Sequence, residues 1–185
     1  MSRLGIITLT LLPLALMGCG SEDESANGEN NTEVESFARC AEEDLALSPF
    51  AGPGYDPDLG LIGPARDTYV ASSTWAVLGT GARPQFDQYA QPIVDVLPTQ
   101  PGLVGFSWGL SAKCNRGRTL TVWESEQALM DFVVGDAHGA AMLHAGEIMI
   151  GAAVTHWEVQ EVDVPLLWEA AHAKLAEIEP RSTVE

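Results

Sequence analysis

Basic residues are scarce in this sequence. Only 9 lysines and arginines accompany 26 aspartates and glutamates among 185 residues, so the formal net charge is −17. Nucleic acids and anionic membrane surfaces are bound through a basic face, so neither is an expected partner. The length suits one domain of about 100–150 residues with additions. An apolar fraction of 46% is ordinary for a globular chain and excludes disorder throughout.

A hydrophobic run long enough to span a membrane is also missing. The apolar run over residues 4–17 is broken by Pro13 and falls short of the roughly 20 residues that a spanning helix needs. It is typical of a secretion signal. The tetrapeptide LMGC at residues 16–19 follows and resembles the bacterial lipobox.

That resemblance implies a signal peptide over residues 1–18 and acylation of Cys19, with palmitate among the attached chains. Several acyl chains would hold the protein on a membrane. Because no Asp follows Cys19, the resemblance implies the outer membrane, with the protein facing the periplasm of a bacterial cell envelope. The alternative is an ordinary cleaved signal in which Cys19 is incidental.

Residues 19–36 are predicted to form a flexible tether. Positions 20–36 hold six acidic residues, no basic residue and one apolar side chain, Val34. Such a segment cannot bury enough area to offset its ordering entropy. An acidic tail that binds cations is the alternative.

Cysteines are few as well. Apart from Cys19 the chain has Cys40 and Cys114, with no CxxC spacing and no histidine nearby. In an oxidising compartment such a pair favours a disulfide over a metal site.

The remaining pattern predicts one α+β domain. Residues 37–68 are expected to be an N-terminal wrap that begins with a short helix over 37–47 and continues irregularly, with four prolines and four glycines over 48–68. Residues 69–180 then alternate between strand and helix patterns in the order β-α-β-β-α-β plus a terminal helix, a ferredoxin-like arrangement. The expected strands are 69–78, 103–111, 119–123 and 150–159; the expected helices are 84–97 (with a kink or a restart at Pro92), 125–134, 137–147 and 165–178.

One predicted strand is unusual in its two faces. In residues 103–111 four large apolar side chains alternate with small ones, namely Val104, Phe106, Trp108 and Leu110 against Gly105, Ser107, Gly109 and Ser111. The bare face either admits a ligand or allows another element to approach closely.

The segment TVWESEQALMDFVVGDAHGAAM, residues 121–142, resembles the antibiotic-biosynthesis-monooxygenase-like families of the dimeric α/β-barrel superfamily. The resemblance rests on a strand ending in Trp-Glu-Ser, a helix starting at that Ser125, the core residue Phe132, and a histidine, His138, opening the next helix. It implies a ferredoxin-like fold, a homodimer in which two sheets face each other, and a cleft between each sheet and its helices.

That cleft is the expected ligand site. His138 is the candidate acid, base or orienting group, with Trp123, Phe132, Trp108 and Ser107 as ligand-binding neighbours. The structural alternative for His138 is a hydrogen bond that closes a helix end, and for the tryptophans it is core packing. Two functions stay open: binding a small apolar or aromatic molecule, or a cofactor-independent or haem-assisted monooxygenase.

No cofactor or metal is expected. The histidines lack the spacings typical of metal sites, and HExxH, GxSxG and Gly-rich phosphate loops are absent. Haem-degrading relatives carry Trp where this chain has Phe132, and their iron-ligating His falls on Met142. That departure argues against haem degradation and leaves haem binding by His138 or His144 open.

Three basic residues, Lys113, Arg116 and Arg118, cluster near the turn after residue 111. They either attract an anionic ligand or simply form a solvated turn. The pattern favours the solvated turn, because charged residues usually lie on solvated surfaces.

Overall fold

A computed structural model describes residues 40–178 and 181–182. The predicted signal peptide, the lipidation site Cys19 and the tether lie outside the described residues. Among the described residues, no helix is both long enough and apolar enough to cross a membrane.

The chain folds around an antiparallel sheet in the order β1-β5-β6-β4-β7-β8. Its four long strands and the helices between them follow the predicted β-α-β-β-α-β order, and the central strand order β5-β6-β4-β7 is that of a ferredoxin-like fold. These elements are β4 (Thr68–Leu78), α2 (Arg83–Val96), β5 (Leu103–Ser111), β6 (Arg116–Trp123), α3 (Glu126–Val133), α4 (Asp136–Leu143), α5 (Ala145–Ile148) and β7 (Met149–Gln160).

Shorter elements come from the two ends of the described chain. They are β1 (Ala46–Leu47), β2 (Tyr55–Asp56), β3 (Gly60–Leu61), α6 (Trp168–Ala176) and β8 (Arg181–Ser182), with short 3-10 turns at Leu97–Thr99 and Glu161–Asp163. Strands β2 and β3 pair with each other in a separate two-stranded sheet.

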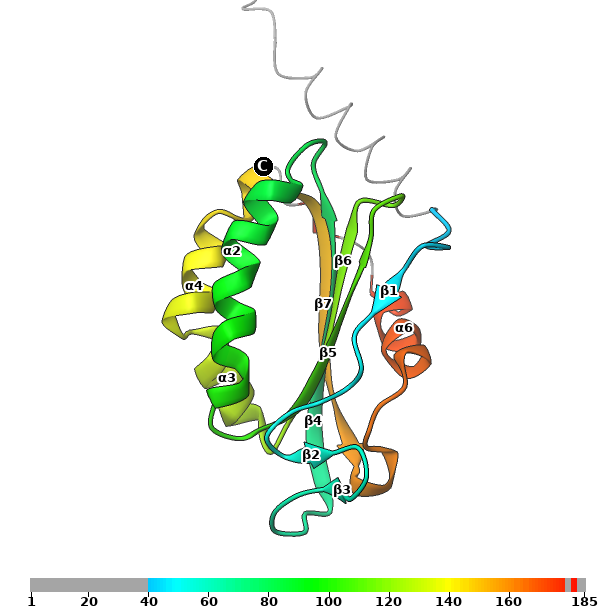
Figure 1. The fold of residues 1–185 in the computed structure, drawn as a ribbon, viewed down its shortest axis with the longest axis vertical. Helices are drawn as coiled ribbons and strands as arrows, with labels where there is room; N and C mark the ends of the chain where they lie inside the picture. Colours follow the sequence, from blue (N-terminus) through cyan, green and yellow to red (C-terminus); the bar gives the residue numbers. More distant parts are fainter. Residues whose placement is uncertain (1–39, 179–180, 183–185) are drawn as a thin grey trace, which may run out of the picture.

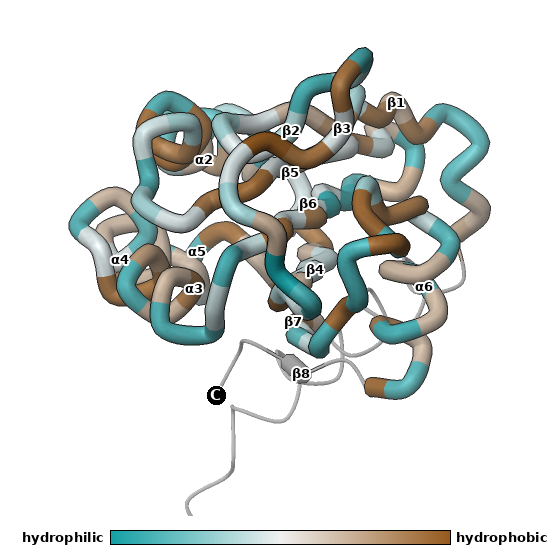
Figure 2. The backbone as a smooth tube through the Cα atoms, turned by 90° about the horizontal axis from the view of Figure 1, so that it is seen from below, coloured by the Kyte–Doolittle hydropathy of each residue, from teal (hydrophilic) through white to brown (hydrophobic). Residues whose placement is uncertain are grey.

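The molecule has three layers. Helices α2 to α5 cover one face of the sheet, called here the helix face, and β1 to β3 with α6 lie on the other, called here the cover face (Figure 1). The perpendicular view shows the same order of layers (Figure 2).

Local sequence signals explain the helix boundaries. Ser125 caps α3, because its Oγ accepts a hydrogen bond from the Ala128 N–H at 3.2 Å. Pro84 lies in the first turn of α2, where its missing N–H costs nothing. A restart of the helix at Pro92 is not observed, since α2 continues through this exposed residue to Val96.

The predicted helix over 37–47 is also wrong within the described residues. Residues 40–47 form an extended segment with one turn and end in β1. Long-range contacts decide this conformation: the Asp44 carboxylate accepts hydrogen bonds from Ser111 Oγ at 2.6 Å and from the Lys113 N–H at 2.9 Å. These bonds are made with a turn almost 70 residues further along the chain, so they override a weak helical pattern.

A β-bulge changes the alternation expected for β5. The register with β6 shifts between Leu103 and Gly105, which leaves Val104 as an extra residue. Val104 therefore packs on the cover face against Leu120 and Val122, whereas Phe106 packs on the helix face as expected.

The bare face of β5 is occupied by the N-terminal segment of the same chain. Phe50 sits on Gly105, where an added Cβ would lie 2.5 Å from its ring, and Leu47 sits on Gly109 in the same way. Of the two interpretations drawn from the sequence, close approach of another element is the one observed.

This arrangement bears on the expected dimer. Two sheets can face each other only through cover faces, and here residues 44–61 and α6 occupy that face, burying Tyr69, Ala71 and Leu120 beneath them. The described chain thus supplies its own second layer, as Figure 1 shows.

Candidate functional site

A cavity lies where the sequence predicts the cleft, between the helix face of the sheet and α2, α4 and α5. It has a volume of about 180 Å³ and is called here the helix-side cavity. Its lining residues are Thr74, Ala76, Phe86, Tyr89, Ala90, Ile93, Val94, His138, Ala141, Met142, Ala145, Ile148 and Met149. Nearly all of these are apolar, so the few polar groups decide what the cavity can recognise.

His138 is the only histidine lining this cavity. Gly135 and Asp136 open α4, which places His138 in the first turn of the helix. Nδ1 lies 2.9 Å from the Val133 carbonyl oxygen, which can only accept, so Nδ1 carries the proton and donates. Nε2 then has a lone pair and no hydrogen-bond partner among the described residues.

The ring is neutral near pH 7. Burial lowers the pKa of His138, and the hydrogen bond to the Val133 carbonyl opposes that shift only partly. A neutral imidazole whose Nδ1 is already bonded presents one acceptor, Nε2. The predicted alternatives for His138 therefore coexist, since the ring both closes the α3–α4 junction and lines the cavity.

Trp123, Phe132 and His138 form a row of packed rings. The Trp123 and Phe132 rings are 5.1 Å apart, and the Phe132 and His138 rings are 5.2 Å apart. Trp123 is fully buried and its Nε1–H donates to Thr121 Oγ1 at 2.8 Å. The two aromatic residues hold the histidine in place and do not line the helix-side cavity.

Trp108 and Ser107 lie elsewhere. Trp108 is partly exposed and lines a separate hollow on the far side of α2, with Phe86 and Ala90 between the two spaces. Ser107 is on the cover face, where its hydroxyl donates to the Ser48 carbonyl at 2.6 Å and accepts from Trp168 Nε1 at 3.1 Å. The structure therefore does not bring Ser107 and His138 to one site.

The other histidines do not join His138. His144 stacks on Tyr89 at 4.4 Å, His156 lies 3.7 Å from Glu126 at the surface, and His172 is on α6. In the part of the chain that the structure describes, no group of three histidine, cysteine, aspartate or glutamate side chains could hold a metal ion.

Most of the residues that line the helix-side cavity carry no chemical signal in the sequence. Phe86, Ala90 and Ile93 lie within the predicted helix 84–97, Met142 drew notice only as the position of a histidine in haem-degrading relatives, and nothing singles out Met149. Apolar periodicity indicates which side of a helix faces inward, but it does not reveal where packing stays incomplete.

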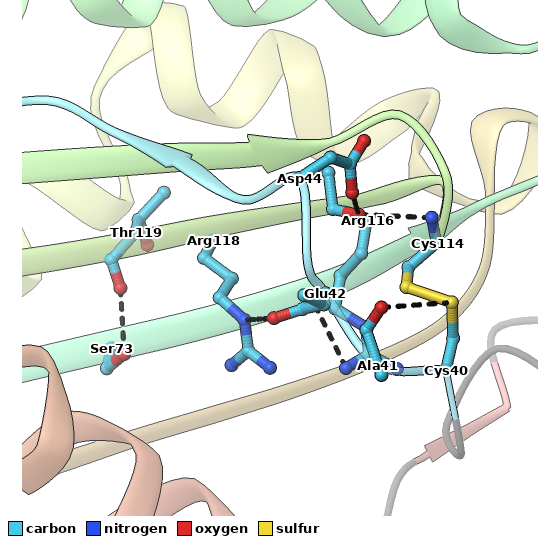
Figure 3. A network of polar contacts seen from close by, with 10 residues as sticks. Cys40, Ala41, Glu42, Asp44, Ser73, Cys114, Arg116, Arg118 and Thr119 are labelled. Atoms are coloured by element: carbon cyan, nitrogen blue, oxygen red, sulfur yellow. Dashed lines mark hydrogen bonds and ion pairs between the residues drawn. A yellow bond between two sulfur atoms is a disulfide. The ribbon is translucent and has the colours of Figure 1, made fainter.

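The predicted disulfide is confirmed. Cys40 and Cys114 are bonded, with Cα atoms 5.6 Å apart, and join the start of the described chain to the turn between β5 and β6. Figure 3 shows this bond beside a set of buried charges.

The prediction that these basic residues form a solvated turn is wrong for two of the three. Lys113 is exposed, but on the cover face Arg116 is buried and the Arg118 side chain is only 11% exposed. Glu42 lies between them, with its carboxylate 3.0 Å from Arg116 Nη1 and 2.6 Å from Arg118 Nε (Figure 3). The guanidinium of Arg116 also stacks over the Trp75 ring at 5.0 Å.

Fold and site together define a ferredoxin-like α+β domain with an apolar helix-side cavity. No family model matches the sequence, and a search of curated proteins finds no match. Solved structures with a similar fold include Rv0793 from Mycobacterium tuberculosis, with a TM-score of 0.45 and 17% identity, covering 48% of this chain and 92% of that one.

Two further solved structures resemble this chain. An antibiotic biosynthesis monooxygenase has a TM-score of 0.44 and 9% identity, covering 48% of this chain and 95% of its own. The protein SO0527 from Shewanella oneidensis has a TM-score of 0.43 and 10% identity, covering 51% and 93%. A shared fold does not define a shared activity, so function is argued from the cavity itself.

Proposed function

We propose that the protein binds a small molecule with a single aromatic ring and a hydroxyl group in the helix-side cavity. The observation that carries this proposal is the His138 ring, whose Nδ1 is bonded to the Val133 carbonyl and whose Nε2 would act as the acceptor, in a lining that is otherwise almost wholly apolar. An apolar cavity of about 150 Å³ is known to accommodate benzene, so about 180 Å³ suits one ring with a substituent. A haem macrocycle needs several times that space.

The chemistry of the cavity favours phenols over simple arenes. A phenol would place its ring against Phe86, Ile93 and Met142 and donate its hydroxyl proton to His138 Nε2. Benzene fills the same space but leaves Nε2 without a donor. One hydrogen bond changes affinity by about five- to tenfold, which sets the expected preference.

Methionine methyl groups offer a direct test. Met142 and Met149 line the cavity, whereas Met130 is exposed on α3 and does not. With methyl-labelled methionine, phenol should shift the NMR signals of the first two and leave Met130 unchanged. Phenol that shifts none of them, or shifts all three alike, contradicts the proposal.

A matched pair of variants isolates the histidine. His138→Ala should weaken phenol binding about five- to tenfold more than benzene binding, because only phenol loses a hydrogen bond to the ring. His156→Ala, on an exposed histidine of β7, is the control and should change neither. Equal phenol and benzene affinities in the wild type would overturn the role of His138.

The neutral ring also favours a second function, a cofactor-independent monooxygenase. His138 Nε2 would take a proton from a hydroquinone, and the electron-rich anion would react with O₂. One oxygen atom enters the ring and the other leaves as water, giving a hydroxyquinone. The substrate itself supplies the two electrons that reduce the second oxygen atom to water. Oxygen uptake with hydroquinone that persists in His138→Ala would contradict this function.

We further propose that Cys19 carries the lipid anchor and holds the domain at the periplasmic face of an outer membrane. The LMGC sequence at residues 16–19 supports this proposal. Membrane fractionation of the full chain against Cys19→Ala tests it, since the variant should become soluble. A variant that still partitions with membranes overturns the anchor.

A homodimer stays a prediction. Because the cover face is occupied by residues 44–61 and α6, a dimer would have to use another surface or displace that layer. Sedimentation of the Cys19→Ala chain measures the oligomeric state directly, and a monomer at all concentrations would contradict the dimer.

A further inference from the structure

A second cavity lies on the opposite side of the sheet. It has a volume of about 270 Å³, is bounded by β4, β6 and α6, and is called here the cover-side cavity. Its lining residues are Trp75, Arg116, Arg118, His172, Leu175, Ala176 and Ile178. Unlike the helix-side cavity, it combines cationic side chains with apolar ones.

The Arg118 guanidinium has donors that could bind a ligand. Its Nε donates to Glu42 Oε2 at 2.6 Å, and its two terminal amino groups point away from that carboxylate in Figure 3. The Arg118 side chain is only 11% exposed, so these groups lie largely out of bulk water. A second anion could therefore bind them with little competition from solvent.

His172 supplies an independent sign of a missing ligand. Its Nε2 atom is buried and has no hydrogen-bond partner among the described residues. A buried polar atom without a partner costs free energy, so a group that bonds it is favoured. Arg118 and His172 come from β6 and α6 and line the same cavity.

From this geometry we propose that the cover-side cavity binds a small organic carboxylate. The carboxylate would accept hydrogen bonds from the Arg118 terminal amino groups and from His172 Nε2–H. Its apolar body would lie against Trp75, Leu175 and Ile178. A planar carboxylate matches the guanidinium fork, and the apolar lining favours an organic anion over a mineral one.

The charges around His172 indicate how a bound anion would change its pKa. Burial lowers the pKa of His172, and Arg118 and Arg116 lower it further, while Glu42 and Glu169 oppose that shift. A bound carboxylate adds negative charge beside the ring and should raise its pKa. This readout reports binding at the cavity itself.

Benzoate and inorganic phosphate are the probes. Calorimetry should detect saturable benzoate binding to the full chain, with a Kd of about 1 mM or tighter, and NMR titration of His172 should show a raised pKa. The methyl signals of Met142 and Met149 should not move, which separates this site from the helix-side cavity. Failure of the phenol proposal would leave this result unchanged.

Two variants and one control test the assigned groups. Arg118→Gln should weaken benzoate binding about 10- to 100-fold and His172→Gln about tenfold, because charge-assisted hydrogen bonds are lost. Arg83→Gln removes the same charge from an exposed arginine that also donates through Nε to one carboxylate, Asp87 at 2.7 Å, and should have no effect.

Three outcomes overturn the proposal. The first is the absence of saturable binding by either probe. The second is benzoate binding that is equal in the wild type and in both cavity variants; His172→Gln keeps the Glu42–Arg118 pair, so it remains informative if Arg118→Gln fails to fold. The third is binding of phosphate without benzoate, which would contradict an organic ligand.

Discussion

The two faces of the sheet are covered in different ways. On the helix face, α2 to α5 come from the segments between strands that are consecutive in sequence and pack mainly through apolar side chains such as Leu78, Leu103 and Leu129. On the cover face, the N-terminal end of the described chain is fastened by a disulfide, by buried ion pairs and by glycine contacts, whereas α6 packs through apolar residues such as Ala171 and Leu175. Hydrophobic periodicity builds the first layer, whereas specific long-range pairs build the N-terminal part of the second.

This difference gives the two cavities different chemistry. The helix-side cavity offers one neutral acceptor, His138, among apolar groups, and the cover-side cavity offers Arg118 and His172 beside Trp75. Removing the disulfide or the ion pairs of the cover face should therefore destabilise that layer and leave the helix face folded.

Loss of the disulfide should have the largest effect. The bond closes a chain segment with a sequence separation of 74, for which chain entropy gives about 4 kcal/mol of stabilisation. Denaturant unfolding of Cys40→Ser against the oxidised wild type measures this loss. Amide exchange should quicken at Ala51 and Gly54, which donate to β5 carbonyls, far more than at Phe86 in α2.

An equal rise in exchange at Ala51 and Phe86 would contradict the independence of the two faces. It would mean that the cover and the helices unfold as one unit.

Removal of the buried carboxylate should come next. Glu42→Gln takes away the charge shared by Arg116 and Arg118 and should lower the free energy of unfolding by about 3 kcal/mol, because buried guanidinium groups depend on their anion. Asp87→Asn breaks the exposed Arg83 pair and should cost about 0.5 kcal/mol or less. If both substitutions lower the free energy of unfolding by similar amounts, burial does not strengthen the Glu42 ion pairs.

Filling a close contact should have a smaller effect. A Cβ at Gly52 would lie 2.4 Å from Gly105 Cα and 2.5 Å from the Val104 carbonyl oxygen, so Gly52→Ala should destabilise by about 2 kcal/mol. Gly139→Ala, in α4 with open space around it, is the matched control and should stabilise by up to about 1 kcal/mol. Thermal unfolding of both variants decides whether the N-terminal segment is held by backbone contact.

Features of the fold that depend on neighbouring residues could be predicted from the sequence, whereas most features that depend on contacts between distant residues could not. Strand and helix patterns placed β4, β5, α3 and β7 within a few residues, and the lone cysteine pair predicted the disulfide. The bulge at Val104 has no signal in an alternating pattern. The burial of Arg118 was missed because its partner, Glu42, lies 76 residues earlier in the chain.

The candidate site follows the same rule. His138 was predicted from its position at a helix start, and it does line a cavity. Trp123 and Trp108 were predicted to join it as an aromatic lining, and Ser107 as part of a bare strand face that leaves room for a ligand. Side-chain direction separates them, since Trp123 is sealed in the core, Trp108 lies beyond α2, and Ser107 faces the cover.

The smallest expected effect is a pH dependence to which both faces contribute. Burial is the leading cause that lowers the pKa of His138 on one face and of His172 on the other, below the 6.5 of an unperturbed histidine. The unfolded chain therefore binds protons more readily, so stability should fall as pH drops below about 6.5 and level off above it. His138→Ala and His172→Gln should each flatten part of that slope in urea unfolding.

Asp44 provides an internal contrast in a separate pH range. Hydrogen bonds from Ser111 and the Lys113 N–H lower its pKa below 3.8, so the stability it contributes is present above that pH and is lost only as pH falls further. Asp44→Asn should therefore leave the slope near pH 6 unchanged and remove one below pH 4. A slope near pH 6 that survives the loss of both histidines would show that neither ring is held neutral by burial, and it would remove the unprotonated acceptor from the helix-side cavity.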